Sequence, residues 1–151
     1  MTKKLIYNYF SDDDFLVISS KITEVEKSTA GEVRVAIKEK RNFRDRKTPI
    51  REFAIKEFRK LGMDNTIDGT GFLILIILEE KQFYILAGKG INEKVEQSVW
   101  DKIRDEMQSS FKNEFYLDGI LTTLSKAGEL LSNYFPIKEG DTNELSNKVA
   151  F

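Results

Sequence analysis

Four side chains with oxygen donors could together bind a hard cation. Asp64 and Asp68 lie in one polar turn, Glu32 directly follows a glycine, and Asn92 follows a glycine-containing segment. Carboxylate and amide oxygens are the ligands that Ca²⁺ and Mg²⁺ prefer. The sequence therefore predicts a divalent-cation site made by these residues, with calcium as the expected ion and magnesium as the alternative, provided that the fold brings them together.

The same residue types also have a purely structural interpretation. Asp64 is an ordinary turn residue, and Asp68-Gly69 is an ordinary turn dipeptide. Gly88 and Gly90 are candidates for a ligand-binding loop, but a glycine pair of this spacing is also typical of a simple strand-to-helix turn. Both interpretations of each segment stay open at the level of sequence.

The composition excludes several kinds of chemistry. The chain has 151 residues with no cysteine and no histidine. Without cysteine there are no disulfides, thiolate nucleophiles, zinc ribbons or iron–sulfur clusters. Without histidine the usual catalytic triads and imidazole bases are absent, and a transition-metal site is not expected. Any bound metal should therefore be a hard cation on oxygen ligands.

Charge and hydropathy give expectations about partners and location. The formal net charge of −1 gives no reason to expect binding to nucleic acid. The longest apolar run, Phe72–Leu78, is too short to cross a bilayer and predicts a buried strand instead. We expect a monomer without membrane insertion, located in the cytoplasm. A protein partner is left open.

The positions of the candidate residues depend on the elements around them. Apolar residues at helical spacing predict helices near 12–28, 49–61, 92–111 and 117–133, and apolar or alternating runs predict strands at 33–37, 72–78 and 83–87. The order α-β-α-β-β-α-α predicts an α/β fold, a three-layer α/β/α sandwich with a small mixed sheet. We expect one domain over residues 1–136 and a polar, flexible tail over 137–151.

This order predicts which segments meet. The first two strands are joined by a helix, so they should run parallel, and the third should return antiparallel. Glu32, Asp64, Asp68 and Asn92 then share one edge of the sheet. The basic segment Lys38–Lys47 lies at the opposite edge, where it is either a solvated loop or a surface for an acidic partner.

Four short motifs resemble the TPM domain family. Its "TxGE-[IV]-x-V" opening resembles residues 29–35, and its polar turn leading into an apolar strand is similar to residues 68–75. Its "I-x-x-G-x-G-[LI]" and "Y-x-x-G-[IL]" motifs are similar to residues 85–91 and 116–120. The resemblance covers approximately residues 12–136. It is closest to the short, stand-alone cytoplasmic bacterial members, whose relatives include thylakoid proteins linked to photosystem repair and animal receptor modulators.

The resemblance implies an α/β/α sandwich and an association with calcium or another divalent cation. It also implies acid phosphatase activity for some members. This chain departs from the pattern, because Asn92 and Gln97 stand where many members carry acidic residues. The leading hypothesis is a cation-binding domain with a binding or regulatory task. The alternatives are a metal-dependent phosphatase acting on phosphomonoesters and a protein-interaction module that uses the basic loop 38–47.

Overall fold

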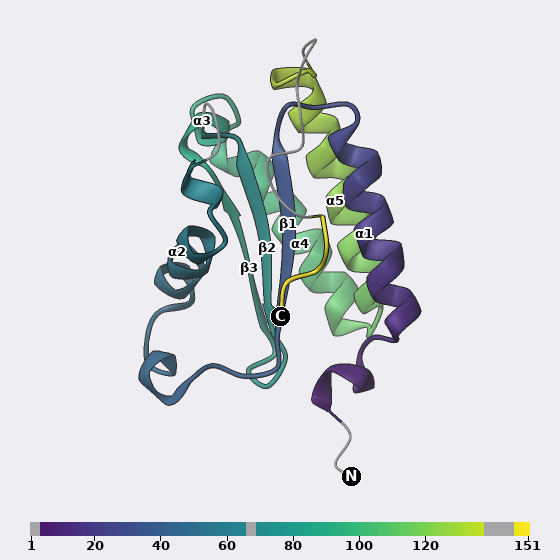
Figure 1. The fold of residues 1–151 in the computed structure, drawn as a ribbon, viewed down its shortest axis with the longest axis vertical. Coiled ribbons are helices and arrows are strands. Elements are labelled where there is room, and N and C mark those ends of the chain that lie inside the picture. The colour runs from purple at the N-terminus through teal and green to yellow at the C-terminus, as the bar shows by residue number, and fades with distance from the viewer. Residues whose placement is uncertain (1–3, 66–68, 138–146) are drawn as a thin grey trace.

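The sheet forms the middle of three layers. The computed structural model describes residues 4–65, 69–137 and 147–151. Helix α2 covers one face of the sheet, and helices α1, α4 and α5 cover the other (Figure 1). The elements are α1 (Asp12–Glu26), β1 (Glu32–Lys38), α2 (Ile50–Lys60), β2 (Gly71–Ile77), β3 (Gln82–Ala87), α3 (Lys89–Asn92), α4 (Gln97–Lys112) and α5 (Tyr116–Tyr134). The expected sandwich and its element order are confirmed.

Strand β2 is the centre of the sheet. It pairs in parallel with β1 and antiparallel with β3. All its residues are buried, as the absence of polar alternation in the sequence predicted. Alternate side chains of β2 enter two separate cores: Phe72, Ile74 and Ile76 face α1, α4 and α5, whereas Leu73, Leu75 and Ile77 face α2.

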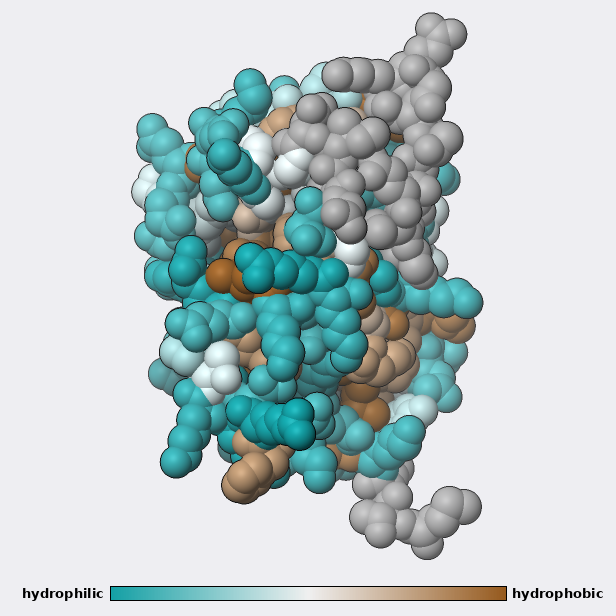
Figure 2. Space-filling view, turned by 60° about the vertical axis from the view of Figure 1, so that its left-hand side comes forward, coloured by the Kyte–Doolittle hydropathy of each residue, from teal (hydrophilic) through white to brown (hydrophobic). Residues whose placement is uncertain are grey.

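Helix α2 is the thin outer layer of the molecule. Its inner face buries Phe53, Ala54 and Phe58 against the sheet. Its outer face is charged, so the surface on this side is mostly hydrophilic, with separate hydrophobic patches (Figure 2). The helix begins at Ile50 after Pro49, and no side chain caps its start. The carbonyl of Thr48 accepts a hydrogen bond from Arg41.

The helix expected from Asn92 onward is broken in the structure. The short α3 ends at Asn92, and α4 begins after Glu96, whose backbone is extended. Ile91 is fully buried at the edge of the sheet, while Trp100 packs its ring against Phe72 under the sheet. The chain must change direction between these two anchors, which a continuous helix cannot do.

The last described residues, 147–151, pack on the outer edge of β1, while most of the flexible tail expected over 137–151 lies outside the described residues. Ala150 donates a hydrogen bond to the carbonyl of Val35 and accepts one from the amide of Ile37, at 2.9 and 2.8 Å. Val149 is buried, and the Phe151 ring contacts Phe15 edge-on. The outer edge of β1 offers unpaired backbone groups, and pairing with them stabilises the last residues.

No helix within the described ranges combines the length and apolarity needed to cross a membrane. The most apolar segment, β2, is instead enclosed between the two helical layers.

We expect Gly128→Ala to destabilise the contact between α1 and α5. A β-carbon at this position would lie 2.9 Å from both methyl groups of Val25, a buried and stiff side chain. Overpacking of this kind costs about 1–3 kcal/mol, more than the roughly 1 kcal/mol that alanine contributes through helix propensity. Chemical denaturation measures the difference. Val25→Ala in the Gly128→Ala background should recover stability, and strictly additive effects would contradict the steric explanation.

Candidate functional site

The sheet register brings the predicted cation-binding segments to one edge. Glu32 at the start of β1 is paired with Gly71 at the start of β2, and the Glu32 amide donates to the Thr70 carbonyl at 3.0 Å. The Gly88 amide, just after β3, donates to the Gly71 carbonyl at 2.7 Å. The starts of the two parallel strands and the end of β3 therefore lie side by side, as the topology predicted.

The glycines at this edge allow the backbones to approach closely. Gly69 has a φ of 64°, and a β-carbon there would lie 2.7 Å from the Gly90 nitrogen. A β-carbon on Gly88 would lie 2.4 Å from the Gly69 carbonyl oxygen. Gly69 and Gly88 are thus explained by contact between two turns. Whether the Gly88–Gly90 segment also binds a ligand stays a prediction.

The four candidate ligands differ in environment. Glu32 is 3% exposed, whereas Asp64, in the 3-10 helix Met63–Asn65, and Asn92 are exposed. The Asn92 amide nitrogen donates to the Ala87 carbonyl at 2.9 Å. Asp68 lies outside the described residues. Among the residues that the structure describes, no group of three or more acidic side chains is arranged to hold a metal.

Glu26 is a neighbour of Glu32 that the sequence analysis missed. It lies in the last turn of α1, and its carboxylate accepts a hydrogen bond from the Val33 amide at 2.9 Å. Burial raises the pKa of Glu26 to about 8, the Glu32 carboxylate acts in the same direction, and the Val33 amide and Arg34 oppose them. A glutamate in the last turn of a helix opposes the helix dipole, and this was the available sequence signal.

The basic loop at the opposite edge is partly neutralised. Arg41 is buried, and its guanidinium binds both oxygens of Glu80 at 2.6 Å and stacks over Phe53. This pairing lowers the pKa of Glu80. Arg46 lies 3.9 Å from Glu79. Arg41 is therefore a structural residue, and the surface available to a partner is made by its neighbours in the loop.

We expect Glu26→Gln to stabilise the protein increasingly as pH rises. The folded-state pKa of Glu26 is raised from 4.5 to about 8. Its contribution to stability is therefore complete below pH ~4.5 and is lost as pH rises through about 8. Glutamine keeps the oxygen that accepts from Val33 and carries no charge. The gain should be roughly 1 kcal/mol near pH 9, reduced by solvent screening, or about 2–4 °C in Tm.

Thermal unfolding of both proteins between about pH 5 and pH 9 measures this effect. Glu24→Gln, on the exposed side of the same helical turn, is the matched control and should show no such growth across this range. A Glu26→Gln difference that stays constant with pH would contradict the raised pKa.

Comparison with known proteins agrees with this architecture. The model of the TPM domain matches residues 7–130. The NMR structure of the BA42 protein from the psychrophilic bacterium Bizionia argentinensis is 33% identical, covers 99% of both chains and superposes with a TM-score of 0.85. No curated protein matches the chain significantly.

Two more distant structures share the fold. The N-terminal domain of a P. gingivalis protein is 19% identical, with a TM-score of 0.68, covering 84% of this chain and 79% of that one. The N-terminal domain of the Corynebacterium glutamicum cg2496 protein is 17% identical, with a TM-score of 0.61, covering 90% and 80%. The family model spans most of the chain, and the chain belongs to the TPM domain family.

Proposed function

We propose that this TPM domain binds a divalent cation, calcium or alternatively magnesium, with Glu32, Asp64, Asp68 and Asn92 as the ligands. Its task would be binding or regulatory. The observation that carries the proposal is the convergence of the strand starts and the β3–α3 turn at one edge of the sheet. This convergence of backbone segments supports the proposal that oxygen donors far apart in the sequence act together.

The chemistry of the described donors suits a hard cation. Because the Asn92 amide nitrogen is used by Ala87, the side-chain oxygen of Asn92 points away from that contact and can act as a ligand. The exposed Asp64 carboxylate can add charge without desolvation. Glu26 and Glu32 bring two carboxyl groups close together, and a nearby cation would favour the charged form of Glu26.

A second candidate function is a protein-interaction module at the basic loop. Phe43 is 89% exposed in this loop and lies between Arg41 and Arg46 in the sequence. An aromatic ring beside basic side chains is a common anchor for a partner of opposite charge. Salt-sensitive capture of a partner, lost on charge reversal at Arg44 and Arg46, would favour this function.

We expect calcium to cause saturable amide shifts in an NMR titration, confined to residues near Gly31, Asp64 and Gly88–Glu93. At a calcium concentration ten times Kd, the free energy of unfolding should rise by about 1.4 kcal/mol. Asp64→Asn and Asp68→Asn should each weaken binding by roughly tenfold, because each removes one ligand charge. Magnesium should compete at the same residues.

Asp13→Asn, an exposed aspartate at the start of α1, is the matched control and should leave the affinity unchanged. Shifts scattered over surface carboxylates without saturation at about 10 mM calcium would overturn the proposal. The phosphatase alternative makes the additional demand that a generic phosphomonoester is turned over with calcium or magnesium. That turnover must disappear in Asp64→Asn while the fold is retained.

A further inference from the structure

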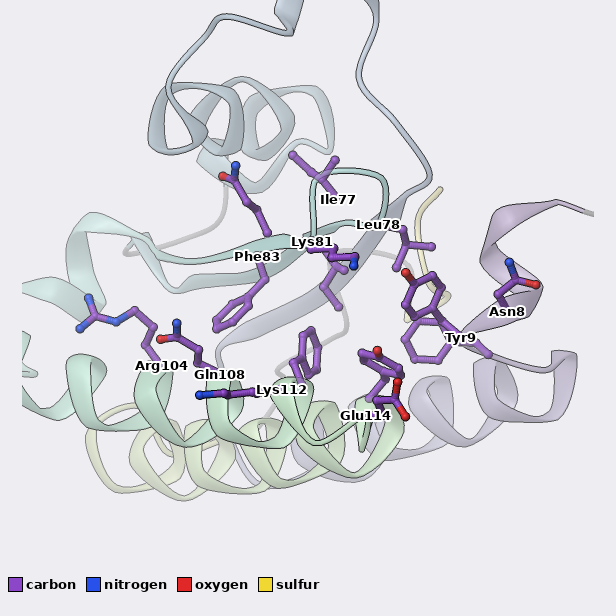
Figure 3. A pocket seen from close by; sticks show the side chains of 15 residues that line it. Asn8, Tyr9, Ile77, Leu78, Lys81, Phe83, Arg104, Gln108, Lys112 and Glu114 are labelled. Carbon is purple, nitrogen blue, oxygen red and sulfur yellow. The ribbon is translucent and has the colours of Figure 1, made fainter.

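A groove opens at the end of the molecule opposite to the proposed cation edge. Its volume is about 980 Å³, and it lies between the β2–β3 hairpin, the C-terminal half of α4 and the segment before α1 (Figure 3). A row of aromatic rings follows its wall. Phe83 contacts Phe111, Phe111 contacts Tyr116, and Tyr116 contacts Tyr9, with ring centroids 4.8 to 5.5 Å apart.

Two turns at this groove carry charged residues where glycine is the usual residue. Lys81 and Glu114, with φ of 52° and 66°, are the non-glycine residues in the left-handed region among those described. Lys81 ends the hairpin turn before β3. At the end of α4, the amides of Glu114 and Phe115 donate to the carbonyls of Phe111 and Ser110, a Schellman motif whose left-handed position is normally glycine.

Lys81 and Glu114, the two residues with a strained backbone, both line this groove. Backbone strain outside glycine persists where the surroundings impose it, and it gathers at functional sites. At these turns a glycine would remove the strain, yet the chain places a lysine and a glutamate there. The charged side chains of Lys81 and Glu114 therefore point to a ligand in the groove.

The charge of the groove is mostly positive. Its charged lining residues are Lys81, Arg104, Lys112 and Glu114. Arg104 already pairs with Asp101 and Asp105 at 3.4 and 3.3 Å. Within the described part of the chain, no carboxylate lies within ion-pair distance of Lys81 or Lys112. The groove thus presents two ammonium groups without a described ion pair near an aromatic wall.

The groove runs beside an edge of the sheet that can accept another strand. Strand β3 pairs with β2 on one side, and no other described strand pairs with it. The hydrogen bond from the Gly88 amide to the Gly71 carbonyl shows which opposite residues of β2 and β3 form hydrogen-bonded pairs. Because hydrogen-bonded pairs alternate, the backbone groups of Phe83 and Ile85 point away from β2. Phe83 is both an edge residue and part of the groove wall.

We propose that this groove binds an extended peptide that carries acidic and aromatic or aliphatic side chains. The peptide pairs with the outward backbone groups of β3 and inserts apolar side chains against Phe83 and Phe111. Its carboxylates approach Lys81 and Lys112. Main-chain pairing of this kind supplies affinity, and the neighbouring pocket supplies selectivity. The groove lies at the other end of the sheet, so this proposal does not depend on cation binding.

The test uses a labelled peptide of about eight residues that alternates glutamate with phenylalanine and valine. We expect saturable NMR shifts at the amides of Phe83 and Ile85 and at residues of the aromatic row. The affinity should fall as salt rises, because the charge contacts are solvent-exposed. A peptide with lysine in place of glutamate is the control and should bind at least several-fold more weakly.

Matched variants at the strained turns separate charge from strain. Lys81→Gln and Lys81→Gly should both weaken peptide binding by about threefold, because both remove the charge. Of these two variants, only Lys81→Gly should also raise Tm, by about 2–4 °C, because glycine relieves the backbone strain. Glu114→Gly should also raise Tm, but it should strengthen binding, because it removes the acidic residue of the lining. These opposite effects on binding distinguish a ligand site from turns with no ligand.

Several results would overturn the proposal. Equal binding of the glutamate and lysine peptides would remove the charge argument. The same conclusion would follow from the absence of shifts at β3 up to millimolar peptide, or from an affinity unchanged in all three variants. Concentration-dependent shifts at Phe83 and Ile85 without peptide would assign the edge to a second copy of this chain.

Discussion

The burial of β2 is the constraint on which the other layers depend. Every residue of this strand is inside the protein, and its alternate side chains enter different cores. An apolar strand of this kind cannot leave either face in water, so it requires helices on both sides of the sheet. The single helix α2 covers one face and three helices cover the other, and the crossover through α2 fixes β1 as a parallel neighbour.

The central position of β2 also gives the two ends of the sheet different chemistry. At the start of β2 the chain returns from β3 through contacts so close that Gly69 and Gly88 leave no room for a side chain. At its far end the hairpin carries Lys81 over an open groove. One end is therefore a tightly packed edge with oxygen donors, and the other is a basic surface with aromatic rings.

The sequence predicted the features that depend on periodicity and order. The apolar run of β2, the helical stripes and the parallel crossover together predicted the sandwich and the segments that share an edge. The features that it missed depend on long-range contacts or on unusual residues. The break at Glu96 follows from two distant anchors, Ile91 and Trp100. The pairing of Ala150 with β1 joins segments that no local pattern connects.

The candidate site was predicted less completely for the same reason. Topology brought Glu32 to the start of β2, but nothing in the spacing of residues indicated that Glu26 would reach over the edge of β1 to the Val33 amide. The groove was missed because Lys81 and Glu114 stand at positions where a sequence pattern expects glycine. A left-handed conformation at a charged residue becomes visible when the backbone is known.

The two outer strands of the sheet, β1 and β3, differ in how far their outward backbone groups are already used. This difference indicates where an added strand can bind. The outer edge of β1 is occupied by the Glu26 carboxylate at Val33 and by Ala150 at Val35 and Ile37. On β3 the side-chain amide of Asn92 donates a hydrogen bond to the Ala87 carbonyl. The outward backbone groups of Phe83 and Ile85 lie nearer the groove end of the strand. A strand that pairs with them would meet the basic and aromatic side chains of the groove.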